Sequence, residues 1–147
     1  MAKAKELLLT FLSASPERAG SLFAEDGLLE VPYLASIGVE SRYRGPETIC
    51  AFLRLLHGDV YPGAVFENVA IHMETPNQAF GEYHLTARSA ISGHIVHQQF
   101  FGHLVVQSGK IQLLTEAIDA VVAAEAMFVG GVAEVIAQGD KYRRPVG

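Results

Sequence analysis

The chain has 147 residues, of which 50% are hydrophobic and 18% charged, so it has the size and composition of one folded domain and not of a disordered segment. Its formal net charge is −5, and its one basic cluster lies at the extreme end, at Lys141, Arg143 and Arg144, which argues against nucleic acid as a partner. The single cysteine, Cys50, cannot form an intrachain disulfide, and no apolar run reaches the roughly 20 residues of a membrane span. We therefore expect a cytoplasmic protein with no nucleic-acid and no membrane partner.

The first part of the sequence predicts three helices. Apolar residues recur at helical spacing in the first of them, and a serine, a proline and a glutamate then restart the chain as a capped second helix. A Gly-Pro-Glu run opens the third, which carries one apolar stripe. The expected order is a helix over 7–12, a helix from 15 to 27, a strand over 28–31, a loop over 32–44 and a helix from 45 to 58.

After residue 63 the hydrophobic periodicity changes to two, with β-branched and aromatic residues between turn signals. Strands are expected over 64–74, 78–91, 94–106 and 110–118. Their short connections predict an antiparallel meander, and helices followed by long strands are typical of an α+β domain. We expect this domain to span residues 1–120 and to be followed by a C-terminal extension over 121–147, helical as far as Met127.

This order of elements resembles the SnoaL-like, ketosteroid-isomerase-like members of the nuclear transport factor 2-like (NTF2-like) superfamily. The local sequence marks are Leu22-Phe23-Ala24-Glu25-Asp26-Gly27, then Tyr43-Arg44-Gly45-Pro46 before Ile49 and Phe52, and Ser108-Gly109-Lys110-Ile111 before the last strand. The segments 66–69 and 75–77, with Glu82 and Glu116, are similar to the phenazine-biosynthesis A/B proteins. The resemblance implies a cone-shaped, curved antiparallel sheet wrapped over three N-terminal helices, a ligand cavity at its open end, and a homodimer through the outer sheet face.

The resemblance does not extend to the catalytic residues of ketosteroid isomerases. Their general base is the Asp of a Glu-Asp-Pro run after the first strand, and here that run reads Glu30-Val31-Pro32. Their second acid aligns with Gly102, and the tyrosine of their first helix falls near Leu8. Because Val31, Gly102 and Leu8 carry no exchangeable side-chain proton, we do not expect steroid isomerisation.

Strand register decides which polar side chains face the expected cavity. Glu82 and His84 share one face of their strand, because side chains alternate. The next strand offers either an even, apolar set or an odd, polar set, and the length of the turn at 92–93 selects between them. We favour the even set as inward because it is apolar. The even set is Val96, Gln98, Phe100, Gly102 and Leu104, and the odd set includes His97, Gln99, Phe101 and His103.

With this register the candidate catalytic residues are Glu116, His84 and Glu82. Glu116 lies between apolar neighbours on its own face, so burial would raise its pKa, and it is the strongest candidate. The structural alternatives are that Glu82 pairs with Arg88 or Lys110, that Gln98 satisfies buried backbone groups, and that Tyr43 covers the third helix. The expected ligand-binding residues are Tyr33, Tyr43, Leu53, Leu56, Gln98 and Phe100.

We expect no metal site and no cofactor. His94 and His97 point to opposite faces of one strand, while His97 and His103 share a face but stand roughly 20 Å apart. Two functions remain: a cofactor-free acid/base isomerase, cyclase or condensing enzyme for a small hydrophobic or aromatic metabolite, or a non-catalytic ligand-binding or dimeric accessory domain.

The outer face of the meander is the expected dimer surface. Its expected residues are His97, Gln99, Phe101, Val105, Tyr83 and Leu85. Such a patch is too apolar to remain wet, and a twofold pairing would cover both copies of it at once. The alternative is that the C-terminal segment 121–137 folds back over this face.

Overall fold

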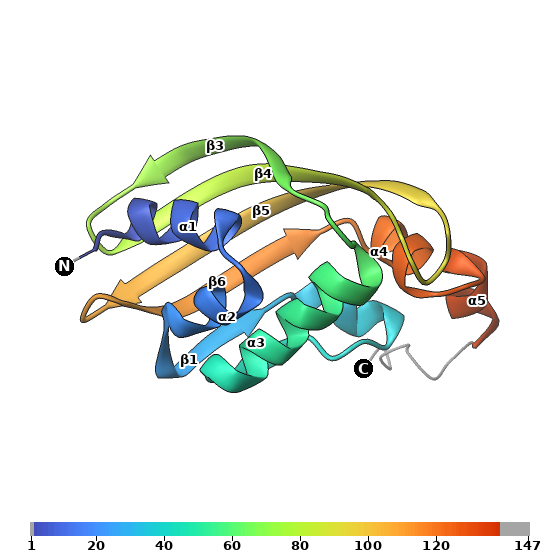
Figure 1. Cartoon of the computed structure of the whole chain (residues 1–147), viewed down its shortest axis with the longest axis horizontal. Coiled ribbons are helices and arrows are strands. Elements are labelled where there is room, and N and C mark those ends of the chain that lie inside the picture. Colours follow the sequence, from blue (N-terminus) through green and yellow to red (C-terminus); the bar gives the residue numbers. More distant parts are fainter. Residues whose placement is uncertain (1, 139–147) are drawn as a thin grey trace, which may run out of the picture.

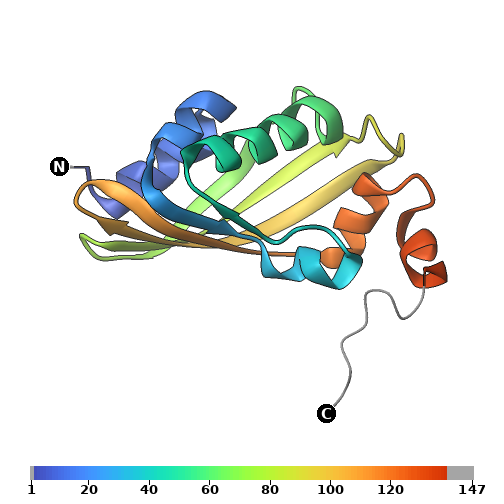
Figure 2. The same cartoon turned by 90° about the horizontal axis from the view of Figure 1, so that it is seen from below.

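The computed structural model describes residues 2–138, and the basic cluster at 141–144 lies outside them. The elements are α1 (Ala4–Ser13), α2 (Pro16–Ser21), β1 (Phe23–Glu30), η1 (Pro32–Ile37), β2 (Arg42–Arg44), α3 (Pro46–Arg54), η2 (Leu55–Val60), β3 (Phe66–Glu74), β4 (Gln78–Arg88), β5 (Ile95–Gln107), β6 (Lys110–Ile118), α4 (Ala120–Met127) and α5 (Gly131–Ala137). A curved six-stranded sheet has the order β2-β1-β6-β5-β4-β3. Helices α1, α2 and α3 lie on one face of this sheet, and α4 and α5 lie beyond one end of it (Figure 1, Figure 2). The predicted α+β cone is confirmed.

The helical part departs from the prediction at the ends of its elements. Ser15 caps α2 by accepting a hydrogen bond from the Arg18 backbone N–H, but the helix ends at Ser21, because the next residue already bonds β6: the Leu22 carbonyl accepts the Ile111 N–H at 2.9 Å. The predicted loop over 32–44 holds the short helix η1 and the strand β2. Helix α3 continues into the wider π-helical turn η2 instead of ending at Gly58.

The meander is confirmed, with β3 to β6 within a few residues of their predicted bounds, but the sheet is mixed and not fully antiparallel. Strand β1 pairs in parallel with β6, with Leu29 opposite Leu114 and Glu30 opposite Thr115. The sequence could not show this pairing, because residues 31–109, about half of the chain, lie between the two strands. Helix α3 packs against β1 and β2 at this side of the sheet.

The register of β5 follows the prediction, whereas that of β4 is reversed. Val96, Gln98, Phe100 and Leu104 are buried, so the even set of β5 faces inward. On β4 the inward residues are Tyr83 and Leu85, with Tyr83 opposite Phe100. The turn is longer than the two or three residues considered: residues 89–94 close it, with the Ser89 N–H bonded to the His94 carbonyl at 2.8 Å. Glu82 and His84 therefore lie on the outer face, which corrects their expected position.

The C-terminal helices close one end of the cone. Ala123, Ala124 and Ala126 of α4 are buried in the main core, and the Ser89 hydroxyl donates to the Ala126 carbonyl at 2.5 Å. The predicted helix as far as Met127 is confirmed, while the domain boundary at residue 120 remains a prediction. None of the described helices is alone long and apolar enough to cross a bilayer. Helices α4 and α5 have that length and composition only when they are taken together, and they are bent by 96° relative to each other.

Candidate functional site

A cavity of about 260 Å³ opens between the N-terminal helices and the concave face of the sheet. Its walls come from α1, α2, α3, η2 and the strands β3 to β6, so both the helices and the sheet contribute to it. The lining is mostly apolar, with polar side chains at few points. The lining residues are Phe11, Leu12, Ser13, Ala14, Pro16, Ala19, Leu53, Leu56, His57, Tyr61, Ala64, Val65, Phe66, Leu85, Phe100 and Glu116.

Glu116 is the one carboxylate in this lining. It lies on β6, its residue is only 7% exposed, and its Oε2 accepts a hydrogen bond from the hydroxyl of Tyr83, which is fully buried on β4. Strand β5 runs between these two strands, and Gly102 is opposite both Gly81 and Glu116. A Cβ on Gly102 would collide with the Tyr83 hydroxyl. The glycine therefore leaves the space through which Tyr83 reaches the carboxyl group.

Burial sets the electrostatics of this pair. Loss of hydration raises the pKa of Glu116 to about 7, and the Tyr83 hydrogen bond only partly opposes this. Burial, together with the neighbouring Glu116, raises the pKa of Tyr83 well above its usual range. Tyr83 is therefore a permanent donor near neutral pH, whereas Glu116 is present both as carboxylic acid and as carboxylate. A group balanced in this way can accept and return a proton.

His57 is a second polar group on the cavity wall, and it was not among the residues predicted for the site. It lies in the π-helical turn η2, with its ring 6.1 Å from that of Phe66 in an edge arrangement. Burial lowers the pKa of His57, which keeps the imidazole neutral near pH 7. Such turns are frequent at functional sites, but no residue pattern marks them in advance.

Three of the expected ligand-binding residues line the cavity: Leu53, Leu56 and Phe100. Gln98 lines a smaller space of about 30 Å³ on the far side of Glu116. Its side-chain amide donates to the Asp119 carbonyl at 3.0 Å and accepts from the Asp119 N–H at 2.9 Å. Gln98 thus satisfies backbone groups where β6 turns into α4, as its structural alternative required.

The two expected tyrosines lie outside the cavity, which corrects their assignment. Tyr33 is 54% exposed on η1, because the segment that was expected to cover the cavity folds into a short helix beside α4. Tyr43 stacks on Phe52 at 3.9 Å, and its hydroxyl donates to the Glu40 carbonyl at 2.6 Å. Tyr43 therefore covers α3, which was its structural alternative.

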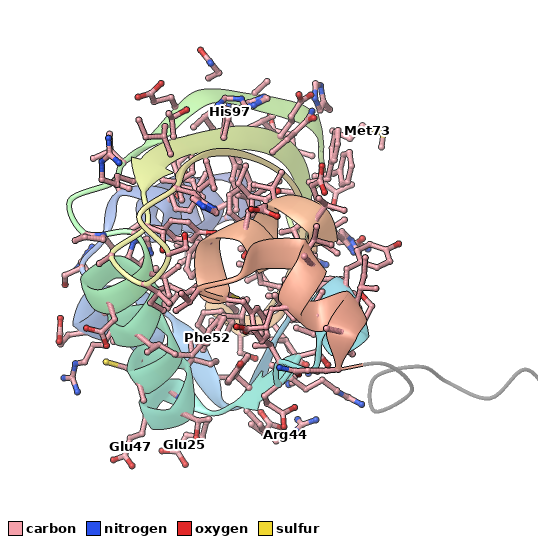
Figure 3. The ribbon with its side chains drawn as sticks, turned by 90° about the vertical axis from the view of Figure 1, so that its right-hand side faces the viewer. Glu25, Arg44, Glu47, Phe52, Met73 and His97 are labelled. Carbon is pink, nitrogen blue, oxygen red and sulfur yellow. The ribbon has the colours of Figure 1, made fainter. Side chains whose placement is uncertain are left out.

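Glu82 and His84 occupy a polar network on the outer face of the sheet. Glu82 bonds His72, His84 and Gln99 there, and neither Arg88 nor Lys110. Figure 3 shows His97, a neighbour of this network, on the outer side of the curved sheet, away from Phe52 in the interior. The two predicted partners of Glu116 thus lie on the opposite face of the sheet from the cavity.

Comparison with known proteins shows which of them share this fold. No family model and no curated protein sequence matches the chain. A phenazine biosynthesis-related protein from Pseudomonas aeruginosa is similar in structure, with a TM-score of 0.70 and 17% identity over 84% of this chain and 83% of the other. An NTF2-like protein from Burkholderia thailandensis has a TM-score of 0.68 and 20% identity over 86% of this chain and 98% of the other. A protein from Jannaschia that is proposed to be a SnoaL-like polyketide cyclase has a TM-score of 0.65 and 14% identity over 84% of this chain and 90% of the other. The chain therefore has the cone-shaped α+β fold of the SnoaL-like and other NTF2-like proteins.

Proposed function

We propose that the protein is a cofactor-free acid/base enzyme that binds a small organic molecule against Glu116 and moves a proton on it. The observation that carries this proposal is a single carboxyl group, buried in an apolar cavity, with a pKa raised to about 7 and a fixed hydrogen-bond donor, Tyr83. Such perturbed groups in a cavity are the usual mark of proton-transfer sites.

The proposed reaction is the migration of a proton next to a carbonyl group. The Glu116 carboxylate removes a proton from a carbon beside the carbonyl, and the electron pair moves onto the carbonyl oxygen as an enolate. The carboxylic acid then returns the proton to another carbon of the conjugated system, so that the net change is an isomerisation. Tyr83 holds the carboxyl group in place throughout and stabilises its ionised form through the hydrogen bond.

Glu116 takes the place of the acidic residues that the resemblance to ketosteroid isomerases led us to seek. Their second acid aligns with Gly102, which lies directly opposite Glu116 on the neighbouring strand. A carboxyl group therefore still reaches this wall of the cavity, although it comes from β6 and not from β5. The Tyr83 side chain fills the space beside Gly102.

The size and charge of the cavity narrow the ligand class. An apolar cavity of about 150 Å³ holds benzene, and pockets for drug-sized ligands begin near about 300 Å³. A volume of about 260 Å³ therefore fits a molecule of one or two rings. The lining contains no Lys or Arg, so an anionic ligand would be buried without a countercharge. We infer a neutral, one- or two-ring ligand that carries a carbonyl or hydroxyl group.

Binding of 2-naphthol and of 2-naphthoate, which match in shape and differ in charge, tests this ligand class. We expect 2-naphthol to bind at least about tenfold more tightly at pH 8, because an unpaired buried carboxylate costs far more than one factor of ten in affinity. Naphthol fluorescence reports the binding directly, since the chain has no tryptophan. Ala64→Phe should weaken the binding of 2-naphthol more than that of phenol, because the larger side chain would fill part of the cavity. Equal affinity for the two naphthyl probes would contradict the assignment.

We also propose that the chain forms a homodimer through the outer face of the sheet. Phe101 is 37% exposed there and stacks on Phe80 at 6.1 Å. Tyr83 and Leu85, expected in this patch, are buried on the inner face of the sheet instead. The alternative was that segment 121–137 covers this face. Within the described residues it does not, because α4 and α5 lie beyond the end of the sheet (Figure 2). A second copy would bury both phenylalanines, as an interface core rich in aromatic residues requires.

Phe101→Glu should dissociate this dimer, since each added carboxylate would meet its symmetry mate in a buried interface. Light scattering should give twice the chain mass of 15.9 kDa for the parent protein and the single mass for the variant. Val129→Glu is the matched control, because Val129 is exposed after α4 and away from the sheet. A parent protein that stays monomeric at micromolar concentration would exclude the dimer.

A further inference from the structure

The outer face of the sheet carries a connected group of histidines that the proposed reaction does not use. His84 on β4 and His97 on β5 are diagonal neighbours across the strand pair, since His84 is opposite Gln99 and Thr86 is opposite His97. Their rings stack at 5.3 Å, and His84 Nδ1 lies 3.3 Å from His97 Nε2. The pair depends on the register of β4 against β5, so histidine spacing along a single strand does not predict it.

The other nitrogen of each ring already has a partner. His84 Nε2 lies 3.2 Å from Glu82 Oε2, and His97 Nδ1 lies 2.6 Å from Thr86 Oγ1. A carboxylate only accepts hydrogen bonds, so His84 Nε2 carries the proton and His84 Nδ1 presents a lone pair. When Thr86 accepts in the same way from His97 Nδ1, His97 Nε2 presents a second lone pair. Two lone pairs then face each other across the 3.3 Å gap.

A tetrahedral metal ion fits between two nitrogen atoms at this spacing. Zn²⁺ binds imidazole nitrogen at about 2.0–2.1 Å, and at a tetrahedral angle two such nitrogens stand about 3.3–3.4 Å apart. A hydrogen bond in which one ring nitrogen donates its proton to the other is the competing arrangement at this separation, and a zinc titration distinguishes the two. The hydrogen bonds that His84 and His97 donate to Glu82 and Thr86 in this arrangement correspond to the outer contacts that orient histidine ligands in metal sites.

We propose that His84 Nδ1 and His97 Nε2 bind Zn²⁺ on the outer face of the sheet, with Glu82 and Thr86 orienting the two rings. Among the described residues no group of three or more His, Cys, Asp or Glu side chains surrounds a common metal position, so water supplies the remaining ligands. The His84 side chain is 20% exposed in the single chain, and in the proposed dimer a second copy would cover the same outer face. The site lies on the opposite face of the sheet from Glu116 and is independent of the proposed reaction.

A zinc titration of the full chain, prepared without a histidine tag, tests this site. We expect one Zn²⁺ per chain, measured by calorimetry or by competition with a chromophoric chelator. His84→Gln and His97→Gln should each lower the affinity by at least about 100-fold, and Glu82→Gln should lower it by about 10–100-fold through the lost orientation of His84. Binding of 2-naphthol by the same variants should not change, which shows that they are folded.

His103→Gln is the matched control for the zinc titration. His103 lies on the same face of β5 and bonds Gln78 at 2.8 Å, but it takes no part in the histidine pair. Its replacement should leave the zinc affinity unchanged. A parent protein that binds no Zn²⁺, or a loss of affinity as large for His103→Gln as for His84→Gln, would overturn the proposal.

Discussion

Glu116→Gln should slow the exchange of the α-protons of 2-tetralone in deuterated water by about 10²–10⁴-fold, while the ligand still binds. This ketone is neutral, has two rings and carries acidic C–H groups beside its carbonyl, so it fits the inferred ligand class. The amide keeps the shape of the carboxyl group and its contact with Tyr83 but cannot accept a proton. A positioned general base contributes about 10²–10⁴ to such a rate, and we expect a loss in that range. Mass spectrometry of the recovered ketone measures it.

The pH profile and a control variant make this result specific. Because the pKa of Glu116 is raised to about 7, exchange by the parent protein should rise with pH and level off above about pH 7. Glu67→Gln, which removes an exposed carboxylate on β3, should not alter the rate. A parent protein that binds 2-naphthol yet exchanges no proton would instead support the non-catalytic binding domain.

The same variant gives a stability readout with a defined sign. Glu116 binds its proton more tightly in the folded chain, where its pKa is about 7, than in the unfolded chain, where it is near 4.5. Its contribution to stability is therefore complete below about pH 4.5 and is lost as the pH rises through about 7. Relative to Glu116→Gln, the parent protein should lose roughly 3 kcal/mol of unfolding free energy over this interval. Urea unfolding at both ends of the pH interval measures the change.

Gly102→Ala should be among the most destabilising single-methyl additions in the protein. The new Cβ would overlap the Tyr83 hydroxyl and approach the ring itself to 3.0 Å, in a site with no free volume on that side. Overpacking of this kind costs about 1–3 kcal/mol, and any relief by movement of Tyr83 would break its hydrogen bond to Glu116. Both stability and α-proton exchange should therefore fall. Denaturant unfolding and the exchange assay report the two effects separately.

A double-mutant cycle identifies the cause of that loss. Tyr83→Phe removes the overlapping hydroxyl, so Gly102→Ala should cost less in this background than in the parent protein. Gly81→Ala is the matched control on β4, because its Cβ would approach its neighbours only to 3.2 Å. If Gly102→Ala lowers the unfolding free energy equally in both backgrounds, the hydroxyl of Tyr83 is not the reason that residue 102 must be glycine.

The sequence predicted most of the fold because local signals marked its elements. Proline and serine at the start of α2 and alternating residues in the long strands are read directly from neighbouring residues. The extent of β1 and its parallel partner were missed, because residues 23–27 are held in the sheet by contacts with β6, far along the chain. Tertiary pairing outweighed the helical pattern there.

The site was predicted only where a residue's own strand decided its direction. Glu116 lies among apolar neighbours on β6, and that local pattern is enough to indicate burial. Tyr83 was missed because its direction depends on the long turn at 89–94, and a shift of one residue in β4 exchanges Tyr83 and Leu85 for Glu82 and His84. His57 depends on a π-helical turn, for which the sequence offers no comparable signal.

The pairing of β1 with β6 also determines when the protein can fold during its synthesis. The Thr115 hydroxyl bonds the Glu30 carboxylate at 2.8 Å across a separation of 85 residues. At about 5–20 residues per second, a ribosome needs roughly 4–17 s to make the chain between these two positions. For that time β1 can pair only with β2, where Leu29 is opposite Tyr43, and its β6 side stays open. The strand that ends this period also carries Glu116, so the cavity lacks its carboxyl group until β6 has been made.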